Sequence, residues 1–372
     1  MPKIVFFITE DWAFLSHRLP LARAARDAGW DVVIATHVTT KADVIEAEGF
    51  RLEPIPLDRG GVHPWRELKA LAALADVLIR HRPDILHCVA VKPVLYGNLI
   101  AFLTRQKATV SALAGMGYAY TAGSLKVRTL RSVLSTLLRL LLRRPNSHLI
   151  VQNEDDRDLM LKIGAATPAT ITLIPGSGVD LQALPALPPP DNSPVIFALV
   201  ARMLADKGVR EAVEATGRVE GALLWLVGSP DPHNPSSIDE AELRGWEKDG
   251  RVKWLGHRND ILEIWRQADV AILPSYREGT PKALLEAAAC ARPIITTDVV
   301  GCRQVIDDGV EGRIVPARSP HGLAEAMKRL AEDAGLRHDM GRAARRRAEQ
   351  RFSQEKVVEM HFAIYRALSG HP

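Results

Sequence analysis

Residues 274–290 read PSYREGTPKALLEAAAC and follow a short apolar stretch, ADVAILP, at residues 268–274. This order predicts a buried strand, then a loop, then a helix rich in alanine and leucine. Two glutamates, Glu278 and Glu286, lie eight positions apart, which corresponds to about 80° around a helix and about two turns along it. Both carboxylates can therefore face one elongated ligand, although the spacing also fits a solvated helix face.

If Glu278 instead lies at the entry of the helix, the free N–H groups of the first turn become available. They belong chiefly to Gly279, Thr280 and Lys282, and the helix N-terminus adds a partial positive charge. Such a terminus binds a sugar hydroxyl or a phosphate. Gly279 and Pro281 at the helix start favour this functional interpretation.

The stretch resembles the paired-glutamate signature of retaining, nucleotide-sugar-dependent glycosyltransferases of the GT-B fold, in particular glycosyltransferase family 4. The resemblance implies an α/β protein with two Rossmann-like domains that face each other across a cleft. It also implies that Glu286 holds the ribose hydroxyls, that Glu278 holds a hydroxyl of the donor sugar, and that Leu285 belongs to the donor site.

The length of 372 residues, with 47% hydrophobic and 25% charged residues, predicts a soluble globular chain of two domains. Forty-eight basic against 44 acidic residues leave a net charge of +4, which favours anionic partners such as nucleotide diphosphates and acidic membranes. Nucleic acid is not an expected partner, because only 5% of the residues are aromatic and no zinc-finger or RNP-like motif occurs.

Three isolated cysteines, Cys88, Cys290 and Cys302, argue against a disulfide framework or a structural zinc site and indicate a reducing cytoplasmic compartment. The N-terminus runs directly into a strand, so no signal peptide is expected. No run approaches the roughly 20 apolar residues of a membrane-spanning helix.

The first half alternates strands and helices, starting with a βαβ unit over residues 3–37. It lacks the GxGxxG fingerprint, so a nicotinamide-binding domain is not expected. The loop after the first strand lies where open α/β sheets bind ligands, and it contains Glu10, His17 and Arg18. These side chains are the expected acceptor-side contacts.

His87 is expected at the carboxyl end of a strand over residues 84–89, facing the same crevice as Glu10. The alternative to a ligand contact is a structural histidine whose ring nitrogens find hydrogen-bond partners in the core or at the strand end. In the family that this sequence resembles, a histidine or aspartate near this point contacts the donor sugar or phosphate. The resemblance therefore makes His87 the candidate catalytic residue of the first half.

Residues 116–146 interrupt the alternation with a glycine-rich loop and a basic amphipathic helix at about 124–145. The apolar side chains fall on one face of this helix, and the basic side chains gather opposite. The arginines of this opposite face are Arg128, Arg131, Arg139 and Arg143. Because the helix contains no acidic residue, it suits an anionic membrane or a lipid diphosphate. An ordinary bundle helix with solvated arginines is the alternative.

The proline-rich segment at residues 181–194, LQALPALPPPDNSP, is the expected linker and hinge. It separates an acceptor-binding domain at residues 1–180 from a nucleotide-sugar-binding domain at residues 195–355. Residues 356–372 are expected to form a helix that crosses back to the first domain, by analogy with GT-B enzymes.

The second domain begins with ARMLADKGV, in which Arg202 leaves a strand and Lys207 precedes a glycine. Fixed cations of this kind bind a phosphate: the Arg202 guanidinium can offer a planar pair of N–H donors, and the Lys207 ammonium can act as a point charge. Two cations after a strand also fit a solvated loop. The resemblance assigns both to the donor diphosphate and makes them catalytic together with His87 and Glu278. It places Gly256 and His257 beside the nucleotide base.

No metal is expected in the reaction. Asp231, His233 and Asp239 match no standard metal spacing and read as a solvated loop. The two cations and the helix N-terminus can neutralise a departing diphosphate without one.

The resemblance implies a retaining hexosyl or N-acetylhexosaminyl transfer, with a UDP-sugar as the expected donor and no other cofactor. The basic helix and the similarity to bacterial polysaccharide and O-antigen enzymes favour an undecaprenyl-diphosphate-linked saccharide as acceptor. The protein would then act at the cytoplasmic face of the inner membrane, as a peripheral protein. A nucleotide-sugar epimerase of the same fold and a catalytically silent nucleotide-sugar-binding scaffold are the alternatives.

Overall fold

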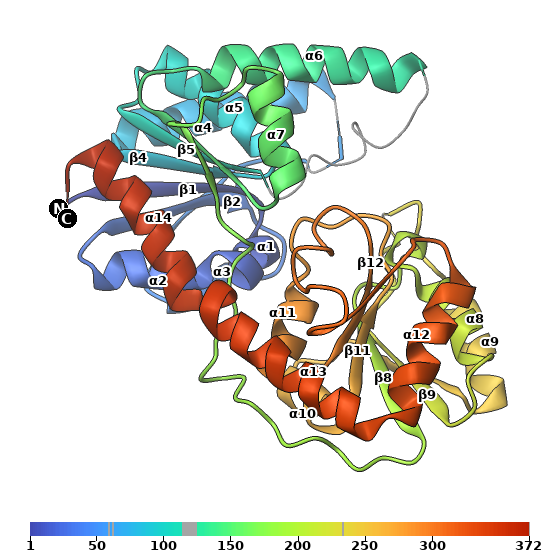
Figure 1. Ribbon diagram of the computed structural model, residues 1–372. Coiled ribbons are helices and arrows are strands. Elements are labelled where there is room, and N and C mark those ends of the chain that lie inside the picture. Colours follow the sequence, from blue (N-terminus) through green and yellow to red (C-terminus); the bar gives the residue numbers. More distant parts are fainter. Residues whose placement is uncertain (59, 62, 114–124, 233, 372) are drawn as a thin grey trace. The chain divides into compact units, whose positions relative to one another are not determined.

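The computed structural model shows two compact units, Met1–Ser177 with Val357–Pro372 and Gly178–Lys356. It describes residues 1–58, 60–61, 63–113, 125–232 and 234–371. Each unit contains one sheet of parallel strands with helices packed on it (Figure 1). This architecture confirms the expected α/β fold with two Rossmann-like domains.

The sheet of the first unit has seven strands in the order β3-β2-β1-β4-β5-β6-β7. They are β1 Lys3–Glu10, β2 Asp31–His37, β3 Arg51–Pro54, β4 Ile85–Val89, β5 Ala108–Leu113, β6 Ser147–Val151 and β7 Ile171–Leu173. β4 and β5 are buried along their whole length, because a parallel sheet is covered by helices on both faces. The strand order reverses between β1 and β4.

Helices cover both faces of this sheet because successive strand residues point to opposite sides. Phe7 packs in one core with α4, α5, α6 and α7, and Phe6 packs in the other with α1, α2, α3 and α14 (Figure 1). The helices are α1 Asp11–His17, α2 Leu19–Asp27, α3 Ala42–Ala47, α4 Pro64–His81, α5 Val91–Leu103, α6 Leu125–Leu142, α7 Glu154–Lys162 and α14 Gln354–Ser369.

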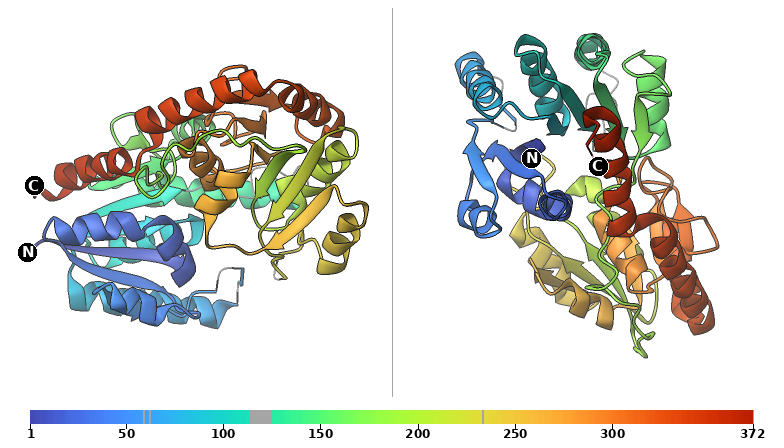
Figure 2. Two further views of the ribbon diagram at one scale, coloured as in Figure 1. Left: turned by 90° about the horizontal axis from the view of Figure 1, so that it is seen from below. Right: turned by 90° about the vertical axis from the view of Figure 1, so that its left-hand side faces the viewer.

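The last helix, α14, packs on the first unit, to which residues 357–372 belong. Val357, Phe362 and Tyr365 of α14 join the core that contains Phe6. The chain therefore ends beside its beginning, and the two termini lie close together in both views of Figure 2.

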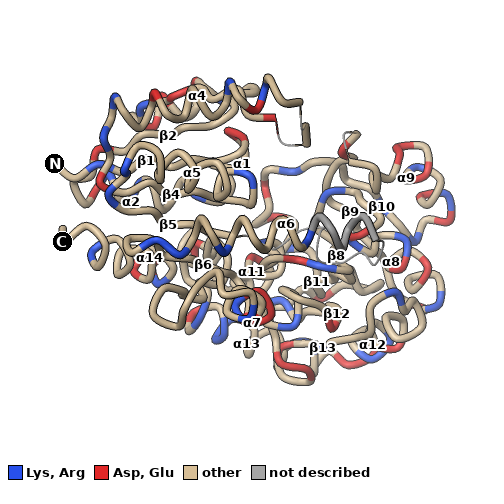
Figure 3. Tube along the Cα trace, turned by 90° about the horizontal axis from the view of Figure 1, so that it is seen from above, with Lys and Arg blue, Asp and Glu red and all other residues tan. Residues whose placement is uncertain are grey.

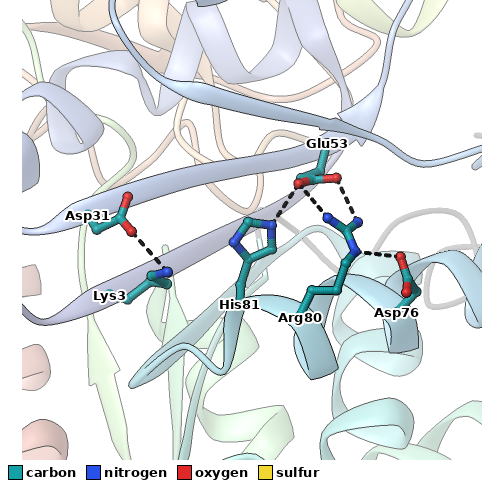
Figure 4. A network of polar contacts seen from close by, with 6 residues as sticks. All are labelled: Lys3, Asp31, Glu53, Asp76, Arg80 and His81. Atoms are coloured by element: carbon teal, nitrogen blue, oxygen red, sulfur yellow. Dashed lines mark hydrogen bonds and ion pairs between the residues drawn. The ribbon is translucent and has the colours of Figure 1, made fainter.

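A polar network fastens the edge strand β3 to the end of α4 (Figure 4). Glu53 of β3 accepts hydrogen bonds from Arg80 Nη2 at 2.9 Å and lies 2.6 Å from His81 Nε2. Arg80 Nε also donates to Asp76 one turn earlier in α4, at 2.7 Å. Edge strands lack a neighbour on one side, so these side-chain contacts supply part of the attachment of β3.

The second unit has a six-stranded sheet in the order β10-β9-β8-β11-β12-β13. Its strands are β8 Val195–Val200, β9 Ala222–Val227, β10 Val252–Gly256, β11 Val270–Leu273, β12 Ile294–Thr297 and β13 Gly312–Val315. Its helices are α8 Val209–Thr216, α9 Glu240–Trp246, α10 Ile261–Gln267, α11 Lys282–Ala289, α12 Pro320–Glu332 and α13 Ala334–Arg347. The strand order reverses between β8 and β11, which is where open α/β sheets bind ligands.

The proline-rich segment at residues 181–194 differs from the expected hinge, because it is fastened to the second unit. Leu187 is buried in the core of that unit. The carbonyl oxygens of Leu184 and Pro188 accept hydrogen bonds from Arg345 Nη1 and Arg292 Nη2, at 2.9 and 2.8 Å. The chain passes between the units at residues 177–178 and 356–357 instead.

Candidate functional site

The loops after β8 and β11 bring three of the expected residues to the reversal point of the second sheet. Arg202 lies two residues after the end of β8, and Lys207 ends a short 3-10 turn, Ala205–Lys207. Glu278 lies in the loop between β11 and α11. Their shared position matches the place where a doubly wound sheet presents its ligand site.

Two glycines allow the backbone segments of this site to approach one another closely. Gly208 has φ +72°, and a Cβ added there would lie 2.2 Å from the carbonyl oxygen of Pro274. Gly301 has φ +86°, and a Cβ there would lie 2.2 Å from the carbonyl oxygen of Gly279. Only glycine adopts these angles without strain, so both contacts require it. The Lys207 turn is thereby held against the end of β11.

Lys207 and Glu278 form the central ion pair of the site. Lys207 Nζ donates to Glu278 Oε1 at 2.6 Å, and Ser275 Oγ donates to the same oxygen at 2.7 Å. The two charged side chains are only 16% and 13% exposed. Both hydrogen bonds end on Oε1, so within the described part of the chain Oε2 of Glu278 remains able to accept from a ligand hydroxyl.

Arg202 is paired with Asp231 from the loop after β9. Arg202 Nη1 lies 2.5 Å from Asp231 Oδ2, and both side chains are partly exposed. The loop is partly exposed, as expected, but the Asp231 carboxylate in it is engaged in an ion pair. Asp239, from the same stretch, caps α9 by accepting the Glu242 N–H at 2.7 Å; His233 lies outside the described residues.

Glu286 lies in α11, and Glu278 lies four residues before that helix, so the two glutamates do not share one helix face. The structure thus selects the second of the two expected arrangements, with Glu278 at the helix entry. Lys282 Nζ approaches Glu286 Oε1 at 3.6 Å. Burial raises the pKa of Glu286, and the nearby Lys282 ammonium opposes this shift.

The remaining residues of the α11 region have different surroundings. Gly279 and Thr280 stay in the partly exposed loop that leads into the helix. Leu285 is 1% exposed and packs in the hydrophobic core of the second unit. Its assignment to the donor site stays a prediction.

Tyr276 is a residue of the site that the sequence pattern does not reveal. Its backbone N–H donates to the carbonyl oxygen of Asp206 at 2.9 Å, and its hydroxyl donates to Glu211. The Arg318 guanidinium lies over its ring, 4.5 Å from the centroid. Burial and Glu211 raise the pKa of Tyr276 to about 12. Tyr276 therefore anchors the loop that carries Glu278 to the Lys207 turn.

Gly256 and His257 lie at the end of β10, two strands away from β8. The carbonyl oxygen of Gly256 accepts from the Gly228 N–H at 2.7 Å. His257 is exposed, and its Nε2 lies 3.2 Å from Asn259 Oδ1. Their contact with a nucleotide base stays a prediction.

His87 does not face a crevice. It is the third residue of the five-residue strand β4, is fully buried, and lies 2.5 Å through Nδ1 from the hydroxyl of Tyr365 in α14. It also stacks on His361 of the same helix, with ring centroids 5.7 Å apart. Burial lowers the pKa of His87 well below its usual value. The expected position of His87 is wrong, because α14 covers the strand at this point, and the structure gives it a packing role.

Arg18 is also buried, with only 3% of its surface exposed, at the junction of α1 and α2. Its Nη1 donates to the carbonyl oxygen of His17 at 3.1 Å, whereas its Nε has no hydrogen-bond partner among the residues that the structure describes. A buried Arg18 cannot act as a surface contact for an acceptor. Glu10 occupies the position before α1 and accepts from Trp12 Nε1 at 3.0 Å, and His17 ends α1. The acceptor roles of Glu10 and His17 stay predictions.

Helix α6 presents both apolar and basic side chains to solvent. Leu134, Leu138 and Leu142 are buried in the core of the first unit. Three other apolar residues of the helix are exposed, namely Val133, Leu137 and, at 69%, Leu140. Basic residues occur along the same helix (Figure 3), and Arg131, Arg139 and Arg143 are exposed; the side chain of Arg128 lies outside the described residues. The apolar surface of α6 therefore extends beyond the face that packs in the core.

None of the helices in the described part of the chain has the length and apolarity that crossing a bilayer requires.

Both halves of the chain match known protein families. Residues 3–153 match the family described as glycosyl transferase 4-like, and residues 194–333 match glycosyl transferases group 1.

Several curated relatives match most of the chain. An N,N'-diacetylbacillosaminyl-diphospho-undecaprenol alpha-1,3-N-acetylgalactosaminyltransferase of Campylobacter jejuni is 26% identical, over 96% of this chain and 97% of its own. A UDP-Gal:alpha-D-GlcNAc-diphosphoundecaprenol alpha-1,3-galactosyltransferase of Escherichia coli is 24% identical, over 81% of this chain and 79% of its own. Among solved structures, sucrose-phosphate synthase of Thermosynechococcus elongatus has a TM-score of 0.82 at 19% identity over 100% of both chains, which shows a shared fold.

Proposed function

The chain belongs to the glycosyltransferases of the GT-B fold, and from this premise we propose that it transfers a sugar from a UDP-sugar to a lipid-linked saccharide. The observation that carries the proposal is the position of the Lys207–Glu278 ion pair and of Arg202 on the loops after β8 and β11, where the order of the second sheet reverses. Two cations suit a diphosphate, and a carboxylate with one available oxygen suits a sugar hydroxyl.

Each of these groups has a distinct role in the proposed donor complex. Arg202 and Lys207 bind the diphosphate, and the first turn of α11 adds N–H donors and its dipole. Glu278 keeps its hydrogen bond from Ser275 and accepts a sugar hydroxyl through Oε2. Glu286, one turn into α11, accepts the ribose hydroxyls, and its burial strengthens hydrogen bonds to a ligand that excludes water.

The proposed reaction retains the configuration of the anomeric carbon. The bond from that carbon to the diphosphate oxygen breaks, and its electron pair leaves with the diphosphate. An acceptor hydroxyl forms the new bond on the same face and gives its proton to the leaving phosphate. Lys207 and Arg202 stabilise the charge that develops on the diphosphate, so we propose that the transfer requires no metal ion.

The proposed acceptor is a saccharide on undecaprenyl diphosphate in bacterial surface polysaccharide synthesis. The names of the relatives from Campylobacter jejuni and Escherichia coli both contain such a lipid diphosphate. The exposed mixture of Leu137, Leu140 and arginines on α6 supports peripheral binding to an anionic membrane, because apolar side chains enter the interface while cations contact lipid phosphates. We place this contact at the cytoplasmic face of the inner membrane.

The experiment that tests the proposal incubates the protein with UDP-sugars and undecaprenyl-diphosphate saccharides in the presence of EDTA. Mass spectrometry detects the added sugar, and NMR of the product reports the configuration of its linkage. We expect transfer that falls about a hundredfold in Lys207→Ala and is unchanged in Lys328→Ala, an exposed lysine of α12. Conversion of the UDP-sugar to an epimer without any acceptor, or no turnover at all, would contradict the proposal.

A further inference from the structure

The charged groups of the candidate site are already paired with one another in the protein without ligand. Lys207 is bound to Glu278 and Arg202 to Asp231. The neighbouring Lys282 and Glu286 form a third, longer pair at 3.6 Å. Each pair sums to zero charge, so a diphosphate can engage Arg202 and Lys207 only by sharing them with carboxylates or by displacing those carboxylates.

The carboxylate of Asp231 is held in place by its loop. The Asp231 N–H donates to Ser237 Oγ at 3.0 Å, and its carbonyl oxygen accepts from the Asn234 N–H at 2.8 Å. Two backbone hydrogen bonds join the same loop to the segment after β8. The Met203 N–H donates to the carbonyl oxygen of Ser229 at 3.0 Å, and the Ala205 N–H donates to the carbonyl oxygen of Ser236 at 2.7 Å. Because its backbone is anchored at both ends, Asp231 is a fixed neighbour of Arg202.

The two carboxylates differ in what else they can contact. Glu278 also accepts from Ser275 and has a second oxygen suited to a sugar hydroxyl. Asp231 sits beside the guanidinium of Arg202, on a loop after β9, and the proposed reaction gives it no contact with the sugar. Removing the charge of Asp231 therefore changes the electrostatics at the diphosphate position without removing a proposed sugar contact.

We propose that Asp231 is a built-in counter-ion of the donor site, which competes with the nucleotide diphosphate for Arg202 and promotes its release. This inference rests on the proposed function, because it requires the diphosphate to bind between Arg202 and Lys207. When the donor enters, Arg202 turns part of its fork toward the diphosphate. When the product leaves, Arg202 returns to Asp231 and Lys207 to Glu278, so no cation is left without a partner. Asp231 is in this sense a positioning residue.

The test compares diphosphate binding by the wild-type protein and by Asp231→Asn, which keeps a hydrogen-bond acceptor at the same place. The probes are UDP and inorganic pyrophosphate, measured by isothermal titration calorimetry at low and moderate salt. Asp339→Asn is the matched control, because Asp339 pairs with Arg342 on the surface of α13 in the same unit and gives the same change of net charge. Thermal unfolding of each variant shows whether it folds, and Asp231→Ser replaces Asp231→Asn if that variant does not.

We expect Asp231→Asn to bind both probes about tenfold more tightly than the wild type, the effect of one unit charge a few ångströms away at a partly exposed site. Its affinity also falls more steeply with salt, UDP dissociates more slowly, and Asp339→Asn behaves as the wild type. Unchanged or weaker binding by Asp231→Asn, while the wild type binds, would overturn the counter-ion role alone. Absence of binding by every variant would overturn the proposed donor site and the inference with it.

Discussion

Acid should destabilise the first unit through the buried histidines that hold α14. His361 is buried, and its Nδ1 lies 2.7 Å from the carbonyl oxygen of Val357. Burial, together with the nearby Arg18 cation, lowers its pKa from 6.5 to about 3. His87 is shifted in the same direction by burial, His361 and Arg18, and Tyr365 completes the buried group with its pKa raised by burial.

The sign of the effect follows from these shifts. A histidine whose pKa is lower in the folded state takes up its proton first in the unfolded chain. The stabilisation is therefore complete above pH 6.5 and is lost as the pH falls toward 3. One pKa unit corresponds to about 1.4 kcal/mol, so lowering the pH from 6.5 to 5 costs about 2 kcal/mol of unfolding free energy from His361 alone.

The assay is urea unfolding at pH 7 and pH 5, followed by circular dichroism. Tryptophan fluorescence adds a local signal, because Trp30 contacts Tyr365 with ring centroids 6.0 Å apart. We expect His361→Gln to lose about 2 kcal/mol less between the two pH values than the wild type does. The control is His63→Gln, at an exposed histidine of the same unit, which should keep the wild-type difference. An equal pH dependence in wild type and His361→Gln would refute the reasoning.

The other predictions concern the donor site and the membrane surface. Glu278→Gln should lower the transfer rate at least tenfold, because the sugar contact weakens. The same variant should bind UDP more tightly, because Lys207 loses its competing carboxylate. A loss of both transfer and UDP binding would contradict the pairing argument. Glu286→Gln should weaken UDP binding about tenfold, measured by calorimetry. It should also raise the melting temperature at pH 7, because burial raises the pKa of Glu286 and so penalises its charged form. A lower melting temperature of the variant would count against this reasoning. Replacing Arg131, Arg139 and Arg143 by glutamate should release the protein from anionic vesicles in a flotation assay, since each basic residue contributes about 1 kcal/mol at such a surface. The control replaces Lys328 and Arg342 of the second unit by glutamate and should leave vesicle binding unchanged. Equal flotation of both variants would exclude α6 as the contact.

The positions of Arg202, Lys207 and Glu278 could be predicted because they follow from sheet topology. Each residue lies in a loop that follows a recognisable strand, and the carboxyl ends of parallel strands share one edge. Their assignment to a donor site comes from the resemblance to glycosyltransferase family 4 and stays a prediction. The fold class followed from the alternation of apolar strands and helices.

The pairing within the site could not be read in advance. Asp231 is separated from Arg202 by a whole strand and helix, and nothing in a loop of Asp, Pro and Ser indicates which cation it will meet. The position of Glu278 is equally ambiguous in the sequence, since its spacing from Glu286 fits both a place in the same helix and a place in the loop before it. The structure shows that the helix begins at Lys282 and that Glu278 lies in the loop.

The sequence alone does not predict the burial of His87, because the last helix covers it. The chemistry of a histidine suggests a ligand contact, but α14 adds His361 and Tyr365 above β4 from more than 270 positions away in the chain. In α6, the sequence pattern predicted a single apolar face, whereas packing buries Leu134 and Leu138 and leaves Leu137 and Leu140 exposed. Burial depends on neighbouring elements, which helical periodicity alone does not contain.

The central claim is that the second unit binds a nucleotide diphosphate between Arg202 and Lys207. The most direct measurement is the thermal unfolding of the wild type and of Lys207→Ala with increasing UDP, in the presence of EDTA. A ligand that binds only the folded state stabilises it by about 2.7 kcal/mol at a hundred times its dissociation constant, so we expect the wild-type transition to rise with UDP and that of Lys207→Ala to stay nearly unchanged. A wild-type transition that does not move with UDP, or that moves equally in Lys207→Ala, would contradict the claim.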